Sequence, residues 1–280
     1  MIERALTCLG PHAFHRLAYC EWPGPADAPT LLCVHGLTRN ARDFDTLAAA
    51  LSVQYRVICP DMPGRGKSEW LESGADYDAP LYLSDIAALI ARLDVETVDW
   101  VGTSMGGNIG MLMAALPHAP IRRLVLNDIG PVIPKEGLKR IADYVGLDPS
   151  FADLDAFEAA LRFIHAPFGP LSDQQWRDMA VQSARRKPDG SIGFNYDPKI
   201  AEPFRKIADA DLDLWAQWER IVCPVLVLRG AHSDILRRSD AEAMTQRGPR
   251  ATLVEFAGIG HAPALLEADQ IAVVRDFLLG

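Results

Sequence analysis

The sequence has 280 residues, of which 49% are hydrophobic and 23% charged, and its formal net charge is −9. This balance is that of an ordinary globular protein, and the length suits one large α/β domain with an insertion, or two small domains. The excess of acidic side chains repels phosphate backbones and anionic lipid headgroups, so neither nucleic acid nor a membrane surface is expected as a partner.

No targeting segment is visible. Residues 1–6 lack a basic region followed by a long apolar run, which argues against a secretory signal. No run of about 18 apolar residues is uninterrupted, so a membrane-spanning helix is not expected. We therefore expect a cytoplasmic protein.

The five cysteines are scattered, most of them in apolar, strand-like runs. They form no CxxC pair and no Cys/His cluster with the sequence spacing of a zinc site. We expect buried thiols in a reducing compartment, and neither a metal nor a cofactor. The cysteines are Cys8, Cys20, Cys33, Cys59 and Cys223.

The order of the predicted elements indicates the fold class. Two short segments flanking Gly10-Pro11 predict a hairpin. Apolar runs without polar alternation then predict strands buried on both faces, and helical patterns lie between them. The strands are expected at 30–34, 56–59, 98–101, 124–126, 225–228 and 252–256, and the clearest helices at 83–93, 105–116 and 269–279. This alternation predicts a doubly wound, mostly parallel α/β sheet, in which ligands bind beyond the carboxyl ends of the strands.

One stretch interrupts the alternation. Residues 131–219 contain no convincing buried strand but several amphipathic segments, at 138–145, 154–163, 173–184 and 211–218. We interpret 131–219 as a helical cap inserted over the strand ends, with the core formed by 1–130 and 220–280.

A sharp strand-to-helix turn is predicted at Ser104. The strand from Val98 runs into Gly102-Thr103-Ser104-Met105-Gly106 and then into a helical pattern. In such a G-x-S-x-G turn the glycines make room for a strained backbone that exposes the serine hydroxyl. A capping serine in a glycine-rich turn is the alternative, but the flanking strand and helix favour a nucleophile.

An oxyanion-binding loop is predicted at His35-Gly36-Leu37, after an early buried strand. Attack by serine on a carbonyl places negative charge on its oxygen, which preorganised backbone N–H groups stabilise. The expected donors are Leu37 and Met105, the residue after the nucleophile. His35 is an alternative base, although a histidine here more often shapes the loop.

The serine needs a histidine base that is oriented by a carboxylate. His261 follows the last predicted strand in a glycine-rich loop, at the correct end of the sheet. Asp234 follows the penultimate strand, and the chain order serine, acid, histidine is the one found with this type of turn. Asp128, after an earlier strand, is the competing candidate, and His232 is expected to help hold the Asp234 loop.

Together these residues resemble the α/β-hydrolase superfamily, in particular its capped serine esterase and carbon–carbon hydrolase-like branch. The resemblance covers nearly the whole chain and implies the α/β-hydrolase fold. Because serine occupies the nucleophile position, the chemistries of members with aspartate there are disfavoured. The quoted motifs are His35-Gly36, Asp61-Met62-Pro63-Gly64-Arg65-Gly66-Lys67-Ser68, Gly102-Thr103-Ser104-Met105-Gly106-Gly107, Ser233-Asp234 and Gly260-His261.

Gly66-Lys67-Ser68 also resembles the end of a phosphate-binding loop. That motif requires a glycine five residues before Gly66, where the sequence has Asp61. We therefore expect a tight turn here, with Asp61 tying loops together, rather than a nucleotide site.

Several residues are candidates for substrate contacts. Arg39 and Asn40 face either the pocket or solvent, and Trp215 and Trp218 either line the pocket or form the core of the cap. Arg185 lies in a short basic run that is most simply a solvated loop.

The function expected from these residues is hydrolysis of a carboxylic ester or lactone of a small-molecule substrate, through an acyl-enzyme. Hydrolytic carbon–carbon cleavage of a diketone can use a similar triad, and Arg39 or Arg185 lining the site would favour it. A ligand-binding member without turnover is the remaining alternative. Oligomeric state does not follow from the sequence.

Overall fold

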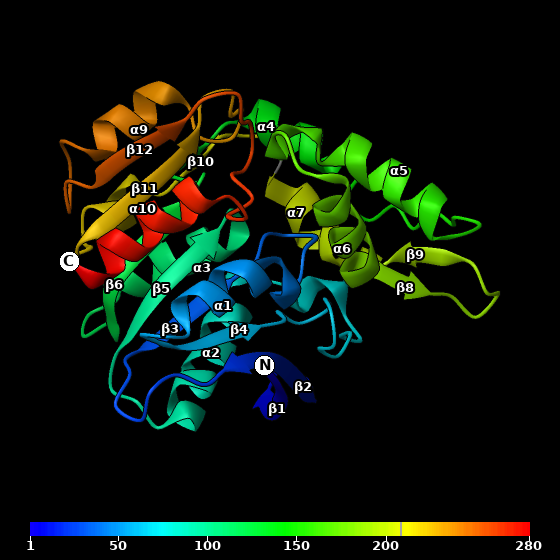
Figure 1. The fold of residues 1–280 in the computed structure, drawn as a ribbon, viewed down its shortest axis with the longest axis horizontal. Helices are drawn as coiled ribbons and strands as arrows, with labels where there is room; N and C mark the ends of the chain where they lie inside the picture. The colour runs from blue at the N-terminus through cyan, green and yellow to red at the C-terminus, as the bar shows by residue number, and fades with distance from the viewer. Residues whose placement is uncertain (208) are drawn as a thin grey trace.

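The buried apolar runs pair side by side into one eight-stranded sheet (Figure 1). The structure, a computed structural model, describes residues 1–207 and 209–280; Ala208, inside the predicted cap, lies outside the described residues. The order across the sheet is β1 (Ile2–Leu9), β2 (Phe14–Trp22), β4 (Arg56–Pro60), β3 (Thr30–Val34), β5 (Val98–Thr103), β6 (Ile121–Asn127), β11 (Val225–Gly230) and β12 (Thr252–Phe256).

The predicted hairpin is confirmed as β1 and β2, which pair antiparallel. β2 pairs antiparallel with β4, and every neighbouring pair from β4 to β12 is parallel. The predicted α/β fold with a mostly parallel sheet is therefore confirmed. Because the parallel strands point the same way, their carboxyl ends meet along one edge, where ligands bind in such folds.

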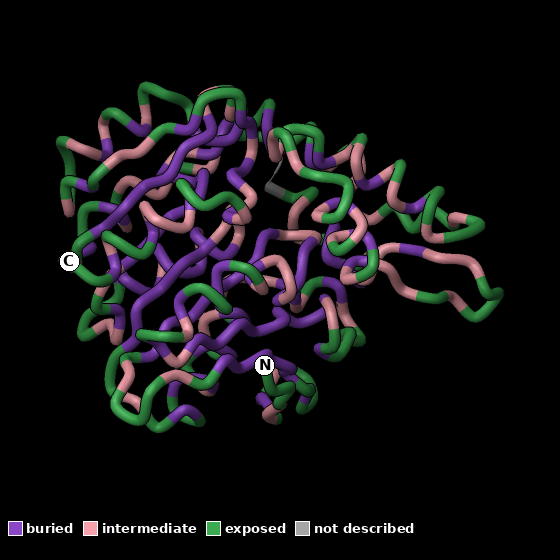
Figure 2. Tube along the Cα trace, in the orientation of Figure 1, coloured by how far each residue is buried: buried purple, intermediate pink, exposed green. Residues whose placement is uncertain are grey.

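The central strands consist of buried residues, as Figure 2 shows by their colour, and their side chains pack on both faces of the sheet. Successive side chains of a strand point to opposite faces. In β3, Leu31 and Cys33 pack on one hydrophobic cluster, and Leu32 and Val34 on the other. An apolar run without alternation is the sequence pattern that this double burial requires.

Helices cover both faces of the sheet. One cluster includes residues of α1 and α10, and the other includes residues of α2, α3 and α9. Their bounds are α1 (Asp45–Leu51), α2 (Ala79–Leu93), α3 (Met105–Ala114), α9 (Arg238–Met244) and α10 (Ala268–Leu279). α2 begins where Asp78 accepts a hydrogen bond from the Leu81 N–H at 3.0 Å, a typical N-cap. The sequence did not predict α1 and α9.

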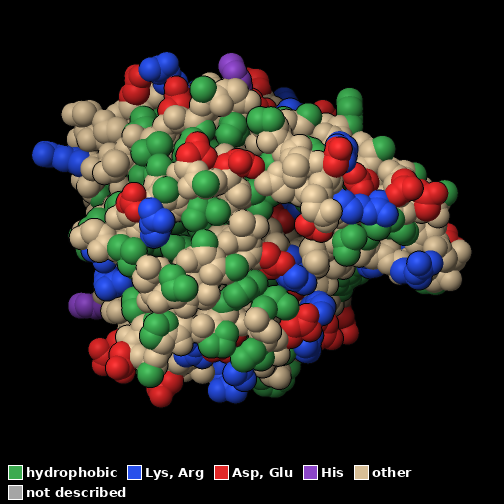
Figure 3. All heavy atoms as spheres, viewed as in Figure 1, with side chains coloured by type: hydrophobic (Ala, Val, Ile, Leu, Met, Phe, Trp, Pro, Cys, Tyr) green, Lys and Arg blue, Asp and Glu red, His purple; other side chains and the backbone are tan. Residues whose placement is uncertain are grey.

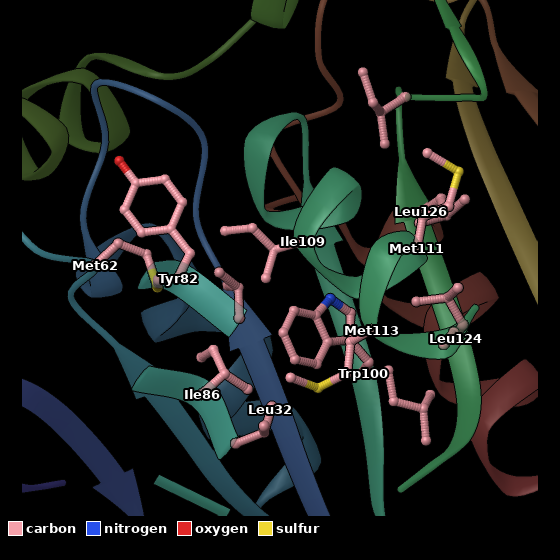
Figure 4. Close-up of a cluster of buried hydrophobic side chains, with 14 of the residues drawn as sticks. Leu32, Met62, Tyr82, Ile86, Trp100, Ile109, Met111, Met113, Leu124 and Leu126 are labelled. Carbon is pink, nitrogen blue, oxygen red and sulfur yellow. The ribbon is translucent and has the colours of Figure 1, made fainter. Parts of the chain in front are cut away.

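Trp100 of β5 lies at the centre of the second cluster and is fully buried (Figure 4). Leu32 and Leu124 from the neighbouring strands and Ile109 and Met113 from α3 belong to the same cluster (Figure 4). The indole Nε1 donates to the carbonyl oxygen of Gly106 at 3.1 Å. Trp100 therefore ties the core directly to the turn that carries Ser104.

The segment between β6 and β11 supplies no strand to the large sheet among the described residues. It contains α4 (Lys135–Ala142), α5 (Leu154–Ile164), α6 (Asp173–Ser183), α7 (Ala201–Ile207) and α8 (Trp215–Trp218). The sequence analysis missed α7 and two small antiparallel pairs, β7 (Val132–Ile133) with β10 (Leu212–Asp213), and β8 (Ala184–Arg186) with β9 (Ile192–Phe194). Strands this short leave almost no periodic signal in a sequence. We call residues 131–219 the insertion.

Charged side chains of both signs are mixed on the face shown in Figure 3. Over α5 and α6, Arg162 pairs with Glu158 and Asp173, and Arg177 pairs with Asp155. Some of the acidic side chains on the insertion are therefore paired with neighbouring arginines. Among the described residues, no helix is long and apolar enough to cross a membrane.

Candidate active site

Ser104 lies on the tight turn between β5 and α3, as predicted, with φ 52° and ψ −115°. This turn leaves no room for side chains at the flanking glycines. A Cβ at Gly102 would lie 2.3 Å from the carbonyl oxygen of Gly106, and one at Gly106 would lie 2.0 Å from that of Val34. Both obstacles are backbone atoms, so only glycine fits, and the G-x-S-x-G pattern is explained sterically.

Three side chains from different strand ends form a hydrogen-bonded chain at this edge. Nε2 of His261, in the loop after β12, is 2.9 Å from Oγ of Ser104. Nδ1 of His261 is 2.7 Å from Oδ2 of Asp128, directly after β6. A carboxylate can only accept, so Nδ1 carries the proton and the unprotonated Nε2 faces the serine hydroxyl. The histidine is thus held in the tautomer that can take a proton from serine.

The prediction that Asp234 orients the histidine is wrong. Asp234 points away from His261 and pairs with Arg140 of α4, at Nη2–Oδ1 3.0 Å, with about half of its side chain exposed. The competing candidate, Asp128, occupies the position instead. Both aspartates follow adjacent parallel strands, β6 and β11, so either could reach the histidine by chain position alone. Which of them turns inward is decided by loop packing that no local pattern reveals.

Asp128 is fully buried and its oxygens are fully engaged. Oδ1 accepts from the N–H of Gly230 at 2.8 Å, and Oδ2 accepts from the hydroxyl of Ser233 at 2.5 Å as well as from His261. These three hydrogen bonds hold the carboxylate in place beside His261. The sequence analysis placed the correct loop here but the wrong residue, because Ser233, not Asp234, faces the site. His232 helps hold that loop through its backbone N–H, which donates to Ile259.

Leu37 and Met105 flank Ser104 in the wall of one cavity. Met105 is the first residue of α3, where backbone N–H groups have no partner within the helix. Within the described residues, neither the Leu37 nor the Met105 N–H donates to a protein acceptor. Both amides are therefore available to an oxygen bound beside Ser104, and the helix N-terminus favours negative charge there.

His35 shapes this loop. Its Nε2 accepts from the N–H of Met62 at 3.0 Å, so its Nδ1 carries the proton and donates to the carbonyl oxygen of Gly36 at 2.7 Å. That carbonyl belongs to the peptide group that carries the Leu37 N–H, so the bond fixes the orientation of the N–H. Burial lowers the pKa of His35 to about 3, which keeps it neutral. His35 makes no contact with Ser104 and does not fit the alternative role of base.

The buried histidines predict that the protein loses stability in mild acid. His35 and His165 are both buried, and burial lowers the pKa of each below its ordinary value of 6.5. A depressed histidine pKa contributes stability that is complete above about pH 6.5 and is lost as the pH falls. For His35 this loss is on the order of 3 kcal/mol between pH 6.5 and 4. Urea unfolding at pH 7, 5.5 and 4 measures it.

A matched pair of variants isolates this effect. His165→Phe removes one buried titrating group, whose ring already stacks on Phe168 at 4.7 Å, and should flatten the pH dependence. His232→Gln, at an exposed position, should leave it unchanged. Equal slopes for wild type and His165→Phe would contradict a contribution from His165.

The cavity beside Ser104 has a volume of about 380 Å³, in the range of small-molecule sites. Its wall is mostly apolar, with Ile109 and Leu112 among its core side chains. The insertion supplies further apolar side chains, including Leu138, Ile141, Ile200, Phe204 and Leu212. Substrate bound there would be enclosed between the strand ends and the insertion.

None of the four residues predicted to contact substrate lines this cavity. Arg39 is buried and bonded to Asp43 and Ser183, and Asn40 donates to the carbonyl oxygen of Gln182. These two residues tie the loop after β3 to α6 of the insertion.

The two tryptophans pack elsewhere. Trp218 is fully buried and donates to the carbonyl oxygen of Arg247, and Trp215 lies under the Arg247 guanidinium at 3.8 Å. Arg185 also lies outside the cavity wall, stacked on Trp70 at 4.9 Å. These predictions failed because chain position near a pocket does not determine side-chain direction.

Four of the cysteines are buried thiols, as predicted, and Cys223 is partly buried. Cys8 and His15 face each other across the β1–β2 hairpin, and both lie against Asp85 of α2. These three buried side chains are close enough to hold a metal ion, a grouping that sequence spacing did not reveal. His15 Nε2 bonds to Asp85 Oδ2 at 2.8 Å, and burial raises the pKa of the Cys8 thiol to about 12. The cluster belongs to a different part of the fold from Ser104.

The fold and the site together define a class. A serine on a glycine-flanked strand-to-helix turn, a histidine after the last strand and two free amides beside the serine are the features of α/β-hydrolases. The chain belongs to the Alpha/beta hydrolase family, whose sequence model matches residues 31–275. It is therefore a hydrolase of the α/β-hydrolase fold, as the resemblance implied.

Three comparisons show the neighbours of the chain in this family. It is 47% identical over 283 residues to the 3-hydroxybutyrate-oligomer hydrolase of Cupriavidus necator, covering 98% of this chain and 97% of the relative. It is 27% identical over 237 residues to the 2-(acetamidomethylene)succinate hydrolase of Mesorhizobium japonicum, covering 83% and 81%. The structure of an alpha/beta hydrolase from Novosphingobium aromaticivorans matches with a TM-score of 0.90 at 39% identity, covering 99% of this chain and 98% of that chain.

Proposed function

We propose that the protein is a serine esterase that hydrolyses short oligomers of 3-hydroxybutyrate, working in the cytoplasm on a small-molecule substrate. The observation that carries the chemistry is the hydrogen-bonded chain from Asp128 through His261 to Ser104 at the wall of a partly open cavity. The substrate class is supported by the relative named for it, which is 47% identical and aligns over nearly its full length. Such oligomers are joined by ester bonds, in keeping with an acyl-transfer site.

In the first half of the reaction, Nε2 of His261 takes the proton from Ser104 as Oγ attacks the ester carbonyl carbon. The carbonyl electron pair moves onto oxygen, where the N–H groups of Leu37 and Met105 stabilise the negative charge. Collapse of this intermediate breaks the ester C–O bond, and His261 protonates the leaving alcohol. Asp128 holds the imidazole and stabilises its protonated form.

In the second half, His261 removes a proton from water, which attacks the acyl carbon. The second tetrahedral intermediate releases the carboxylic acid and returns the proton to Ser104. No metal or cofactor takes part in these steps. The insertion acts as a cap, because its apolar side chains close the cavity over the acyl group.

The cavity wall favours an ester over the diketone alternative. Arg39 or Arg185 lining the site would favour carbon–carbon cleavage, but both lie outside the cavity wall and contact other residues. A small apolar cavity suits the methyl-bearing units of a 3-hydroxybutyrate chain. A binding role without turnover would not require the serine, histidine and carboxylate to be within hydrogen-bond distance of one another.

The test measures release of 3-hydroxybutyrate from its dimer and trimer by chromatography, beside p-nitrophenyl butyrate as a general ester. A fluorophosphonate probe, with mass spectrometry of the labelled peptide, identifies the nucleophile. We expect hydrolysis of all three substrates and a label on Ser104. Hydrolysis of the nitrophenyl ester alone would support the esterase activity but contradict 3-hydroxybutyrate oligomers as the substrate. Absence of both hydrolysis and label would reject the serine mechanism.

A further inference from the structure

The Asp61–Ser68 loop, whose end resembles a phosphate-binding motif, is hydrogen-bonded to the loop that carries Leu37. The Met62 N–H donates to His35 at 3.0 Å, and Oδ1 of Asp61 accepts from the N–H of Ala41 at 2.7 Å. Between them, Arg65 donates from Nε to the carbonyl oxygen of Leu37 at 2.8 Å. Three bonds therefore fix this segment from one side.

Arg65 is fully buried, and among the described residues no carboxylate lies within ion-pair distance of it. Two nearby aspartates are bonded to backbone instead. Asp61 accepts from the N–H groups of Ala41 and Lys67, and Asp78 caps α2. A buried charge without a counter-charge is expensive, so its retention needs a reason.

The guanidinium contacts only neutral groups, and most of them belong to the cavity wall. Nη1 donates to the hydroxyl oxygen of Tyr82 at 2.8 Å and to the Pro63 carbonyl oxygen at 2.6 Å. Among the described residues, the acceptor of Nη2 is the sulfur of Met105 at 3.5 Å, a weak acceptor. The guanidinium also lies 5.6 Å from the centre of the Tyr77 ring. Arg65 thus contacts both residues whose N–H groups flank Ser104.

We propose that Arg65 is the positioning residue of the oxyanion hole and supplies its positive potential. This inference rests on the proposed function. Its Nε bond fixes the peptide after Leu37, and its charged guanidinium contacts the Leu37 carbonyl oxygen and the Met105 sulfur, in the same two residues that carry the amide donors. In the resting state no carboxylate of the described residues lies within ion-pair distance of this charge, whereas in the transition state the substrate oxygen becomes negative. The attraction therefore acts mainly in the transition state, where it raises kcat rather than lowering KM.

The test compares Arg65→Gln, Arg65→Lys and wild type on an uncharged ester, the methyl ester of the 3-hydroxybutyrate dimer. Glutamine keeps a donor and removes the charge, and lysine keeps the charge. We expect about a 100-fold loss of kcat in Arg65→Gln, the size typical of losing one oxyanion donor, with KM little changed. We expect Arg65→Lys to retain most of the activity. Arg185→Met, which removes an arginine bonded to Asp148 outside the cavity, serves as the matched control.

A second readout does not depend on turnover. An alkyl boronic acid forms a negatively charged tetrahedral adduct with Ser104, and its inhibition constant should rise in Arg65→Gln in parallel with the loss of kcat. Thermal unfolding of each variant checks that the fold is retained. If Arg65→Gln does not fold, Arg65→Lys still tests the inference. A role that depends on the charge requires its kcat and its boronate inhibition constant to stay within about tenfold of the wild-type values.

Two results would overturn the inference. Equal losses in the glutamine and lysine variants, accompanied by a rise in KM, would mean that Arg65 only packs the loop. A loss confined to the free-acid dimer, as a rise in KM with its methyl ester unaffected, would mean that Arg65 recognises a substrate carboxylate. Failure of the wild type to hydrolyse any ester would instead reject the proposed function itself.

Discussion

Replacing Asp128 by asparagine is expected to lower kcat/KM for ester hydrolysis by about 10³- to 10⁴-fold. The carboxylate accepts a hydrogen bond from the Nδ1–H of His261, which leaves Nε2 unprotonated and able to take the proton of Ser104. An amide can present its own N–H to Nδ1 and so favours the other tautomer, whose Nε2 already carries a proton. The measurement is steady-state hydrolysis of p-nitrophenyl butyrate, with thermal unfolding to show that the fold is retained.

Asp234→Asn is the matched control, since it makes the same chemical change in the neighbouring loop. Asp234 pairs with Arg140 in a half-exposed ion pair, and such pairs contribute little. We expect activity within about twofold of wild type. A large loss in Asp234→Asn together with a mild effect in Asp128→Asn would show that the acid comes from the loop after β11 during the reaction.

Replacing Ser104 by alanine is expected to lower kcat/KM by about 10⁴- to 10⁶-fold, because the change removes the proposed nucleophile. The hydroxyl makes one hydrogen bond, to His261, so its loss should leave the fold and the cavity unchanged. Hydrolysis rates and fluorophosphonate labelling of wild type and variant measure the effect.

The outcome separates two kinds of failure. If Ser104→Ala keeps its activity, another residue attacks the ester, and the labelled peptide identifies it. If the variant loses activity but also unfolds at a lower temperature, the hydrogen bond between Ser104 and His261 contributes to stability as well as to chemistry. Ser68→Ala is a useful comparison, because that buried serine bonds to backbone away from the triad.

Much of the fold could be predicted from short patterns in the amino-acid sequence. Continuous apolar runs identified the strands of the parallel sheet because burial on both faces leaves no polar alternation. Glycine at positions 102 and 106 identified the turn at Ser104, since a Cβ at either would overlap backbone. His261 followed from its place after the last strand. Each of these features leaves a pattern within a few neighbouring residues of the sequence.

The short pairs β7–β10 and β8–β9 and the helix α7 were not readable in this way. Strands of two or three residues have no period of their own, and their partners lie far away along the chain. The grouping of Cys8, His15 and Asp85 had no sequence signal either. The register of the β1–β2 hairpin pairs Cys8 with His15, and the packing of α2 brings Asp85 to them.

The sequence by itself determined the sheet, the turn that carries Ser104, the place of His261 after the last strand and the amides beside Ser104, because these depend on backbone geometry and on position at a strand end. Only the tertiary structure decided that Asp128 rather than Asp234 meets His261, that Arg39 and Trp218 avoid the cavity, and that Arg65 lies buried behind Leu37 and Met105. The physical reason is the same in each case. The direction of a side chain in a loop is set by packing and hydrogen bonds with segments distant in sequence, and those contacts exist only once the chain has folded.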